Sequence, residues 1–307
     1  MNRASGNEVS VLIINFNSSP HTIDCVRSLI QNSRSSLNYN IIVVDNNSEA
    51  SEFEALLVLK VYKNVMLLRS RVNLGFSGGH TFGLQFANAK YYFFLNNDSI
   101  ILNDCLGILY DFCESVPKAA LCTPQLYTES MERHSSFLYP PTLVPTLFGY
   151  SFARLVNKNR YPDLNKRYEV PLPVDMISGS AMFVRAEAFN EIGGFDTNYF
   201  LYGEEEDLAI RLRNAGYMVY LVPFAHVQHL GQKSTSKSVE MKKEFYISYF
   251  YFYRKHYGFL KTMVFRGLVF LKLLKKGLKN RTSFNLAKFV LFNAKPWNSI
   301  RHKQKIR

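Results

Sequence analysis

The sequence predicts an α/β fold, in which a mostly parallel sheet is flanked by helices and followed by a basic helical tail. Three observations support this prediction. Short apolar runs alternate with helical patterns through the first hundred residues, polar residues follow three of these runs, and the last quarter of the chain is helical in pattern and rich in lysine and arginine. Alternating strand and helix segments fold into parallel sheets covered by helices.

Four apolar runs near the N-terminus are predicted strands. They cover residues 9–15, 40–44, 65–68 and 91–95, and their continuous apolar character is typical of strands buried on both faces. Helices are predicted between them. One follows the Ser19-Pro20 pair, which is a favourable helix start, and the others cover residues 51–59 and 77–87.

The second half of the chain is less regular. Residues 120–175 contain seven prolines and are predicted to form a loop-rich excursion over one side of a cleft. Residues 174–185 return to an apolar segment. A helix is predicted over residues 204–215, ended by Gly216, and a further strand over residues 217–222.

Basic residues are concentrated in the tail. The net charge is +13, but residues 231–307 hold 19 Lys and Arg against 2 acidic residues, whereas residues 1–230 hold 18 against 22. Between residues 260 and 278 one helical face is small or apolar, at positions 260, 264, 267, 271, 274 and 278, with lysines beside it. Such a helix either lies on an anionic membrane surface or packs on the preceding domain. A nucleic-acid partner for the tail is a third alternative.

Composition indicates the class of protein and its compartment. With 47% apolar residues, the chain is a folded protein rather than a disordered one. Its four cysteines form no C-x-x-C pair, the first eight residues are too polar for a signal peptide, and no run reaches the ~18 apolar residues that span a bilayer. We therefore expect a cytoplasmic protein, peripheral at the inner face of the plasma membrane.

Polar clusters follow three of the predicted strands. Asn and Asp are also common turn residues, so one such cluster alone would have a structural explanation. Three of them at the carboxyl ends of parallel strands, where ligands bind in this class of sheet, indicate a ligand site. The clusters are Asn15-Phe16-Asn17, Asp45-Asn46-Asn47 and Asn96-Asn97-Asp98.

Two groups of residues suit the chemistry of such a site. Asp98 follows an apolar strand and is the leading candidate ligand for Mg²⁺ or Mn²⁺, with His229 as a second candidate. The run Glu204-Glu205-Glu206-Asp207 brings together four carboxylates, which raise one another's pKa and so favour a general base near neutral pH. The alternative is that these carboxylates only stabilise the N-terminus of a helix.

A glycine-rich segment, residues 73–79, opens the third predicted helix. Asn73, Gly75, Phe76 and Gly78 lie where a backbone can approach a ligand closely, and the free N–H groups of a helix start favour an anion. The segment is not G-x-G-x-x-G and no acidic residue follows at the dinucleotide spacing, which argues against an NAD site.

Taken together, eight segments resemble the family 2 glycosyltransferases, and within them the rhamnosyltransferase-like branch. In family order they are VSVLIINFN, IIVVDNNS, NLGFSGG, FFLNNDS, MISGSAMFVRAEAF, IGGFD, YFLYGEEEDLAIRLRNAGY and HLGQKS. The resemblance implies a GT-A catalytic domain over residues 1–234, followed by a C-terminal amphipathic basic helical segment over residues 235–307. It also implies an inverting single displacement and a divalent cation.

The resemblance implies roles for individual residues. Asp98 would bind the metal together with His229, which matches a further metal-binding histidine. Asn97 would contact the sugar or phosphate, and Asp45 would accept a hydrogen bond from the pyrimidine base. The donor-binding turn after the first strand is matched by Asn15 and Asn17.

Glu205 takes the position of the catalytic base. The family pattern G-E-D-x-D-L is present with Glu205 in place of the catalytic aspartate, an exchange that keeps the carboxylate and lengthens its reach by one methylene. Glu204 and Asp207 are the rivals for this role. Asn96 replaces the first acidic residue of the D-x-D motif, and His80 stands where asparagine is frequent in the family.

The sequence therefore predicts an inverting glycosyltransferase that uses a nucleoside diphosphate sugar. The branch favours dTDP-rhamnose, with UDP-hexoses next. The expected acceptor is a lipid-linked or oligosaccharide precursor of a bacterial surface glycan such as O-antigen or capsule, and no nucleic-acid partner is expected. The departures at Asn96 and Glu205 leave one alternative, a protein that binds nucleotide sugars or glycans without turning them over.

Overall fold

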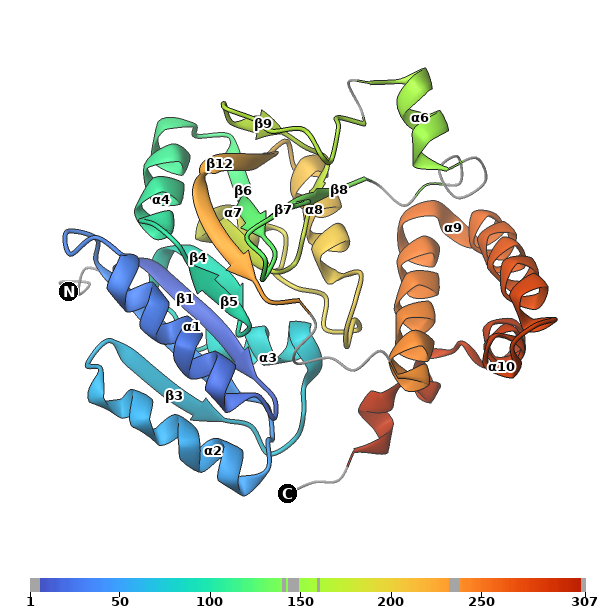
Figure 1. The fold of residues 1–307 in the computed structure, drawn as a ribbon, viewed down its shortest axis with the longest axis horizontal. Helices are drawn as coiled ribbons and strands as arrows, with labels where there is room; N and C mark the ends of the chain where they lie inside the picture. Colours follow the sequence, from blue (N-terminus) through green and yellow to red (C-terminus); the bar gives the residue numbers. More distant parts are fainter. Residues whose placement is uncertain (1–5, 140–141, 143–148, 159–160, 232–237, 305–307) are drawn as a thin grey trace.

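The computed structural model describes residues 6–139, 142, 149–158, 161–231 and 238–304, and within these residues it confirms the α/β fold (Figure 1). A ten-stranded sheet runs in the order β3-β2-β1-β4-β11-β6-β12-β5, and β7 and β9 pair at its side. Successive side chains of a strand point to opposite faces. Accordingly, Tyr91 and Phe93 enter one buried apolar cluster and Tyr92 and Phe94 the other.

The four predicted N-terminal strands are all present and run parallel. They are β1 (Asn7–Asn15), β2 (Tyr39–Asp45), β3 (Val65–Arg69) and β4 (Ala89–Asn96). The connecting helices are α1 (Ser19–Asn32), α2 (Ala50–Leu56) and α3 (Gly75–Leu84). The second predicted helix is shorter than expected, because the chain continues from α2 as a 3₁₀ helix over Leu57–Val61.

The prediction of a loop-rich excursion is wrong at its beginning. β6 (Ala119–Tyr127) is an almost fully buried strand between β11 and β12. The Pro124 of this strand lacks an N–H group, but it lies beside a register irregularity in β12, between Val222 and His226, where the ladder is interrupted. The rest is irregular as predicted, with β7 (Arg133–His134), β8 (Phe137–Leu138), α6 (Tyr150–Val156) and β9 (Leu172–Pro173). The predicted loop prolines 140, 141 and 145 lie outside the described residues.

The remaining strands make the sheet mixed. β11 (Ala181–Arg185) lies antiparallel between β4 and β6, and β5 (Ser99–Ile101) lies antiparallel to β12. β12 (Met218–His229) extends well beyond the predicted residues 217–222, because its irregularity carries the chain past Pro223. The short β10 (Met176–Ile177) pairs with β8, and the helices here are α4 (Cys105–Ser115), α7 (Ala186–Glu191) and α8 (Glu204–Asn214).

The C-terminal segment is helical, as predicted. α9 (Val239–Gly277) is interrupted at Gly258, whose φ of 82° and ψ of 179° are not helical. It is followed by α10 (Arg281–Lys288), a π-helical turn (Phe289–Asn293) and two 3₁₀ helices (Pro296–Asn298 and Ile300–Lys303). The predicted domain boundary at 234/235 falls in residues 232–237, outside the described part of the chain. Among the described helices, none is both long and apolar enough to cross a bilayer.

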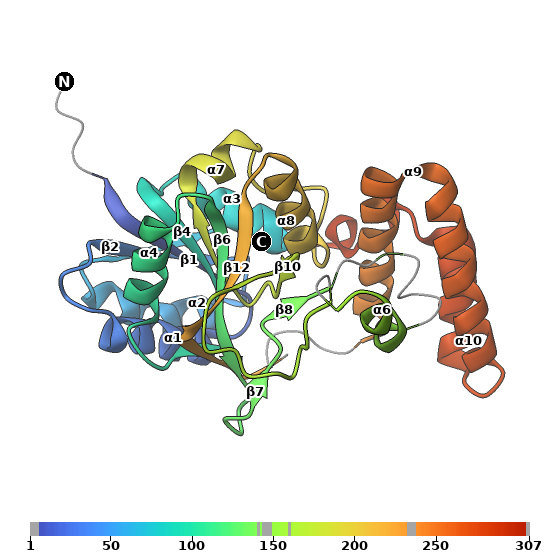
Figure 2. The ribbon, with the colours of Figure 1, turned by 90° about the horizontal axis from the view of Figure 1, so that it is seen from above.

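The two halves of α9 have different surroundings, and Figure 2 shows α9 and α10 at the end of the molecule away from α2. Before Gly258, the Ser248 hydroxyl donates to the Leu201 carbonyl at 2.7 Å, and the Tyr251 hydroxyl donates to Asp196 at 2.8 Å. After Gly258, Leu260 is 78% exposed. The tail therefore packs on the α/β body through its first half and presents apolar side chains to solvent in its second.

Candidate active site

The carboxyl ends of β1, β2 and β4 meet at one edge of the sheet, where their polar clusters are joined by hydrogen bonds. The Asn15 amide donates to Asp45 at 3.0 Å, and the Thr22 hydroxyl donates to Asn15 at 2.7 Å. The Asn97 amide donates to the same Thr22 hydroxyl at 2.9 Å. Buried polar groups require such partners. The three clusters therefore form one connected polar edge.

Asp45 lies within this edge rather than on its surface. The carboxylate is fully buried and accepts hydrogen bonds from Asn15 and from the Ser48 backbone N–H, and Arg69 Nε lies 3.4 Å from it. The next residue, Asn46, is also buried and donates to the Asn73 side chain and to the Gly75 carbonyl, both at 2.9 Å. Of these two residues, Asn46 is the one that lines the cavity described next.

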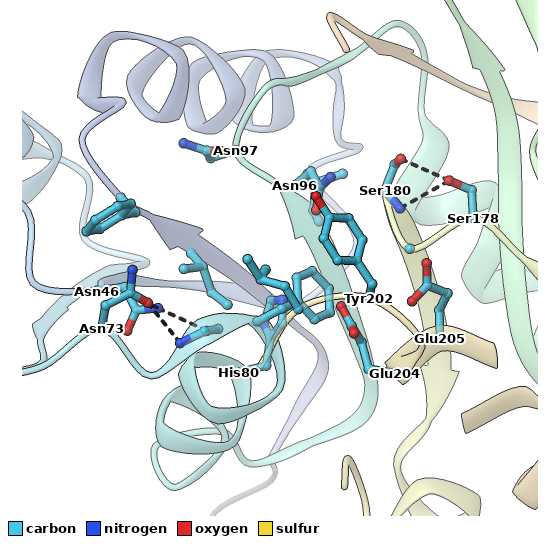
Figure 3. Close-up of a pocket in the computed structure, with 17 residues that line it drawn as sticks. Asn46, Asn73, His80, Asn96, Asn97, Ser178, Ser180, Tyr202, Glu204 and Glu205 are labelled. Atoms are coloured by element: carbon cyan, nitrogen blue, oxygen red, sulfur yellow. Dashed lines mark hydrogen bonds between the residues drawn. The ribbon is translucent and has the colours of Figure 1, made fainter. Parts of the chain in front are cut away.

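A cavity of about 400 Å³ opens beside this edge (Figure 3). Figure 3 shows Asn46 and Asn73 on one side of it and Glu204 and Glu205 on the opposite side. This volume is in the range of pockets that hold small molecules. The predicted site residues that line it are Phe16, Asn73, Gly75, Phe76, Asn97, Glu204 and Glu205.

A second cavity of about 300 Å³ adjoins the first, since Phe16 and Asn73 line both. Asn17 lines this one, in the left-handed region at φ 49°. Its far wall comes from the C-terminus, where the Gln304 side chain accepts from the Asn73 N–H at 2.8 Å and donates to the Asn73 carbonyl at 2.7 Å. The last turn of the tail is thus tied to the glycine-rich segment.

The glycine-rich segment has a packing role in addition to its place in the cavity. Gly75 has φ +72°, and a Cβ atom there would lie 2.2 Å from the Phe200 carbonyl oxygen. Its N–H donates to the Asn73 side chain, and the Phe76 N–H donates to Phe200. These N–H groups already have partners, so the expected anion contact with them requires rearrangement. Gly78 lies outside the cavity lining, against Leu74.

Asp98 and His229 are brought together by strand pairing. β5 begins directly after Asp98, and Ser99 pairs with His229 of β12. His229 Nε2 lies 3.2 Å from an Asp98 carboxylate oxygen. The imidazole is also 3.4 Å from both Asn96 and Ser180, which line the larger cavity. The predicted ligands are therefore adjacent to each other and to the site.

The side chains of Asp98 and His229 suit a hard divalent cation that keeps open coordination positions. One carboxylate and one imidazole are ligands that Mn²⁺ accepts, and Mg²⁺ or Mn²⁺ commonly completes its coordination with water and substrate phosphates. No group of three or more His, Cys, Asp or Glu side chains gathers into a metal site among the described residues. Asp98 and His229 are thus two ligands of types that Mg²⁺ or Mn²⁺ accepts.

The acidic run forms the first turn of α8, and its members face different surroundings. Gly203 precedes it at φ 88°. Burial, followed by the neighbouring carboxylates, raises the pKa of Glu204 to about 8. Burial and then the charges of Glu206 and Glu204 raise the pKa of Glu205 well above its usual range. Glu205 also lies against Gly179, whose added Cβ would be 3.3 Å from its carboxylate. Glu204 and Glu205, the two acidic residues that line the cavity, thus both have a raised pKa, which makes them better proton acceptors.

Asp207 turns away from the cavity and is engaged in ion pairs. It is fully buried and accepts from Arg211 at 2.7 Å and from His256 at 2.7 Å, and Lys255 Nζ lies 2.6 Å away. Burial alone would raise its pKa, but the hydrogen bond from His256 and the charges of Arg211 and Lys255 lower it to about 2. A carboxylate held in this way is a poor proton acceptor.

Several cavity residues had no predicted role. Ser178 and Ser180 lie in the turn before β11, and Tyr202 precedes α8 at φ 72°. His80 is buried among Phe76, Phe94 and Phe195, and this burial lowers its pKa to about 3, so the ring is neutral. The unusual position of His80 after the paired glycines could have marked it as a site residue in the sequence. The serines on either side of Gly179 were a weaker signal of the same kind.

Comparison with known proteins addresses the fold and the family of this chain. A solved structure of GalNAc-T7 with UDP, GalNAc and Mn²⁺ superposes with a TM-score of 0.58 at 15% identity, over 81% of this chain and 50% of that one. This likeness shows the GT-A fold. The rhamnosyltransferase WbbL of Escherichia coli K12 is 29% identical over 218 residues, which cover 67% of this chain and 78% of that protein.

Two further comparisons address the family. An N-acetylglucosaminyl-diphospho-decaprenol L-rhamnosyltransferase of Mycobacterium tuberculosis is 46% identical over 65 residues, 21% of each protein. A family model for the N-terminal domain of galactosyltransferase matches residues 163–233. The model for glycosyl transferase family 2 matches residues 10–193, from the first strand to the end of α7. Because this match covers more than half of the chain, the protein belongs to glycosyl transferase family 2.

Proposed function

We propose that this glycosyltransferase moves a sugar, with inversion, from a nucleoside diphosphate donor to a hydroxyl group of a bacterial surface-glycan acceptor. The observation that carries the proposal is the larger cavity. It places amide side chains of Asn46, Asn73 and Asn97 opposite the carboxylates of Glu204 and Glu205. Amides suit the hydroxyl and phosphate groups of a donor, whereas carboxylates of raised pKa suit proton removal from an acceptor.

Glu205 is the proposed base. It lines the cavity with part of its side chain accessible, whereas Glu204 is more deeply buried and Asp207 is neutralised by cations. In a single displacement, the acceptor O–H bond breaks as its proton passes to Glu205. The oxygen then bonds to the anomeric carbon, and the nucleoside diphosphate leaves from the opposite face. One displacement of this kind inverts the anomeric configuration.

A divalent cation belongs to the proposal. Asp98 and His229 would hold Mg²⁺ or Mn²⁺, and the ion would neutralise charge on the leaving diphosphate. Asn97, tied to Thr22, would contact the sugar or phosphate, with Asn96 beside His229.

For the donor we propose dTDP-rhamnose, with UDP-hexoses as the next candidates. Two of the similar proteins are rhamnosyltransferases, and one of these carries a lipid-diphosphate acceptor in its name. A third relative, from Haloferax volcanii, is a hexosyltransferase and is 25% identical over 245 residues. For the acceptor we propose a lipid-linked or oligosaccharide precursor.

The test is a transfer assay with purified protein, Mn²⁺ and each nucleotide sugar, with donor hydrolysis as a second readout. We expect Glu205→Gln to lower kcat by about 10²–10⁴-fold while donor binding is kept, because the general base is lost. Glu204→Gln is the matched control and should cost much less. If the wild type binds the donor but neither transfers nor hydrolyses it, the protein is a nucleotide-sugar-binding protein and the proposal fails.

We further propose that the protein works at an anionic membrane surface. The support is the second half of α9 and the residue that follows it, where Leu260, Val264, Leu271 and Leu278 are more than half exposed. Exposed lysines flank this stripe, namely Lys261, Lys272, Lys276 and Lys279. Apolar side chains can enter the headgroup boundary, and each nearby cation adds about 1 kcal/mol on an anionic leaflet.

Vesicle flotation tests this location. Leu260→Ser with Leu271→Ser should weaken binding to phosphatidylglycerol vesicles more than tenfold, since each leucine loses about 1.5–3 kcal/mol of burial. Leu155→Ser, at a leucine of α6 that is 75% exposed, is the matched control and should have no effect. Salt-sensitive RNA binding without vesicle binding would favour the nucleic-acid alternative for the tail instead.

A further inference from the structure

The first half of α9 reaches the acidic turn of α8. The Tyr249 hydroxyl donates to the Glu206 carboxylate at 2.7 Å, and the Tyr249 ring stacks on Phe245 with centroids 4.2 Å apart. One residue earlier, Ser248 donates to the Leu201 carbonyl at 2.7 Å. Leu201 lines the cavity. A single turn of α9 thus holds both the loop that leads into the site and the residue next to the proposed base.

Glu205 and Glu206 are adjacent carboxyl groups with unequal surroundings. Two ionised carboxylates cannot hydrogen-bond to each other, but they can once one of them carries a proton. Burial raises the pKa of Glu206, while the Tyr249 hydrogen bond and a hydrogen bond from Glu205 oppose that rise. The pKa of Glu205 is raised by burial, by the charge of Glu206 and by the same shared hydrogen bond. When the pair holds a single proton, that proton therefore lies on Glu205 and the negative charge on Glu206.

We propose that Tyr249 is a positioning residue for glycosyl transfer, which holds the Glu206 carboxylate beside Glu205 so that helix α9 completes the catalytic centre. This inference rests on the proposed function, in which Glu205 is the base. When Glu205 takes the acceptor's proton, the neutral carboxyl donates a hydrogen bond to ionised Glu206. That hydrogen bond stabilises the protonated base. Tyr249 keeps the Glu206 carboxylate, which accepts this bond, charged and in place.

Other charged and titratable groups also face this pair. On α8 these are Glu204 and Asp207, the second of which is engaged by Arg211 and by Lys255 and His256 of α9. Tyr150 of α6 and Tyr202 before α8 have their pKa raised, first by burial and then by carboxylates of the acidic run. Lys255 and His256 of α9 are both directed at Asp207. Tyr249 is therefore the side chain of the tail that donates to Glu206.

The experiment compares Tyr249→Phe, Glu206→Gln and the double variant with the wild type, across a pH series. Without the hydroxyl, Glu206 takes up a proton more readily, and Glu205 then loses the negative charge beside it. We expect kcat of Tyr249→Phe to fall about tenfold, as for a lost hydrogen bond to a charged group, and the acid limb of the kcat profile to move to lower pH. Glu206→Gln should move the limb in the same direction, and adding Tyr249→Phe to it should move the limb no further.

Tyr251→Phe is the matched control. Its hydroxyl also joins α9 to the body, through Asp196, but it does not touch the acidic run. A purely structural role for Tyr249 would give both Tyr variants the same loss of melting temperature and an unmoved acid limb, and that result would overturn the inference. Glu205→Gln separates the two proposals. If it stays active, the base assignment fails. If it is inactive while Tyr249→Phe keeps the wild-type profile, only this inference fails.

Discussion

Asp207 is expected to contribute strongly to stability, although it is not the base that we propose. It joins the acidic helix α8 to the C-terminal helix α9, because it is fully buried and meets Arg211, Lys255 and His256 within 2.7 Å. We consider Asp207→Asn, which keeps the shape of the side chain and removes its charge. A buried ion pair that loses one partner leaves the other charges uncompensated.

The size of the effect follows from the pKa of Asp207. A pKa of about 2 in the fold against 3.8 ordinarily corresponds to ~2.5 kcal/mol at neutral pH, at ~1.36 kcal/mol for each pKa unit. Unfolding entropy is ~2.1 cal/mol/K per residue, or ~0.64 kcal/mol/K for 307 residues. The melting temperature of the variant should therefore fall by ~4 °C if the chain unfolds as one unit.

The assay is thermal unfolding followed by circular dichroism between pH 7 and pH 3. Because the pKa of Asp207 is lower in the fold than in the unfolded chain, its stabilisation is complete above about pH 5, begins to fall near pH 3.8 and is lost as the pH falls through about 2. The gap between wild type and variant should shrink over that range. Asp111→Asn, in an exposed pair with Arg34 at 2.6 Å, is the control and should cost less than about 1 kcal/mol. Equal losses for both variants, or a gap that does not change with pH, would refute the reasoning.

Three further outcomes are expected around the cavities. Gly75→Ala should lower the melting temperature and donor affinity together, because its Cβ would lie 2.2 Å from the Phe200 carbonyl at a positive φ; unchanged unfolding would contradict this. His80→Phe keeps the aromatic packing but removes the ring nitrogen Nδ1, which has no partner among the described residues. We expect the KM for the donor to rise about tenfold in initial-rate assays, as for one lost hydrogen bond to the donor, while the melting temperature changes little. Gln304→Ala removes two hydrogen bonds to the Asn73 backbone and should weaken nucleotide binding in calorimetry, whereas an unaltered Kd would show that the smaller cavity is not used.

The polar edge of the site could be predicted from the sequence because it depends on parallel strands. Residues that follow β1, β2 and β4 must lie at one edge when those strands are parallel, so Phe16, Asn46 and Asn97 share a cavity. Asp98 and His229 were candidate ligands because of their residue types, and their shared role was implied by the family resemblance. The physical cause of their meeting is the pairing of β5 with the end of β12, a non-local contact that periodicity does not reveal.

The parts that were missed depend on tertiary context. Prolines suggested a loop where β6 lies in the sheet, because an irregularity in the partner strand makes room for Pro124. Asp45 was expected to contact a pyrimidine base; in this structure the Asn15 amide and Arg69 hold it inside the edge, and its contact with a base stays a prediction. The pattern of α9 indicated an amphipathic helix but could not show which residues would meet α8, and so the contact of Tyr249 was not foreseen.

Gly258 divides α9 into two halves with different surroundings, and this decides which variants can separate the proposed roles of the tail. Residues before it hold the acidic turn, and residues after it form the exposed apolar stripe. The chain then returns to the body, where Glu244 accepts from Ser299 and the Ile300 N–H, and Gln304 reaches the glycine-rich segment. Deleting the tail would therefore remove the proposed catalytic support and the proposed membrane contacts together. Point substitutions on the exposed face separate the two, since they leave every contact with α8 in place.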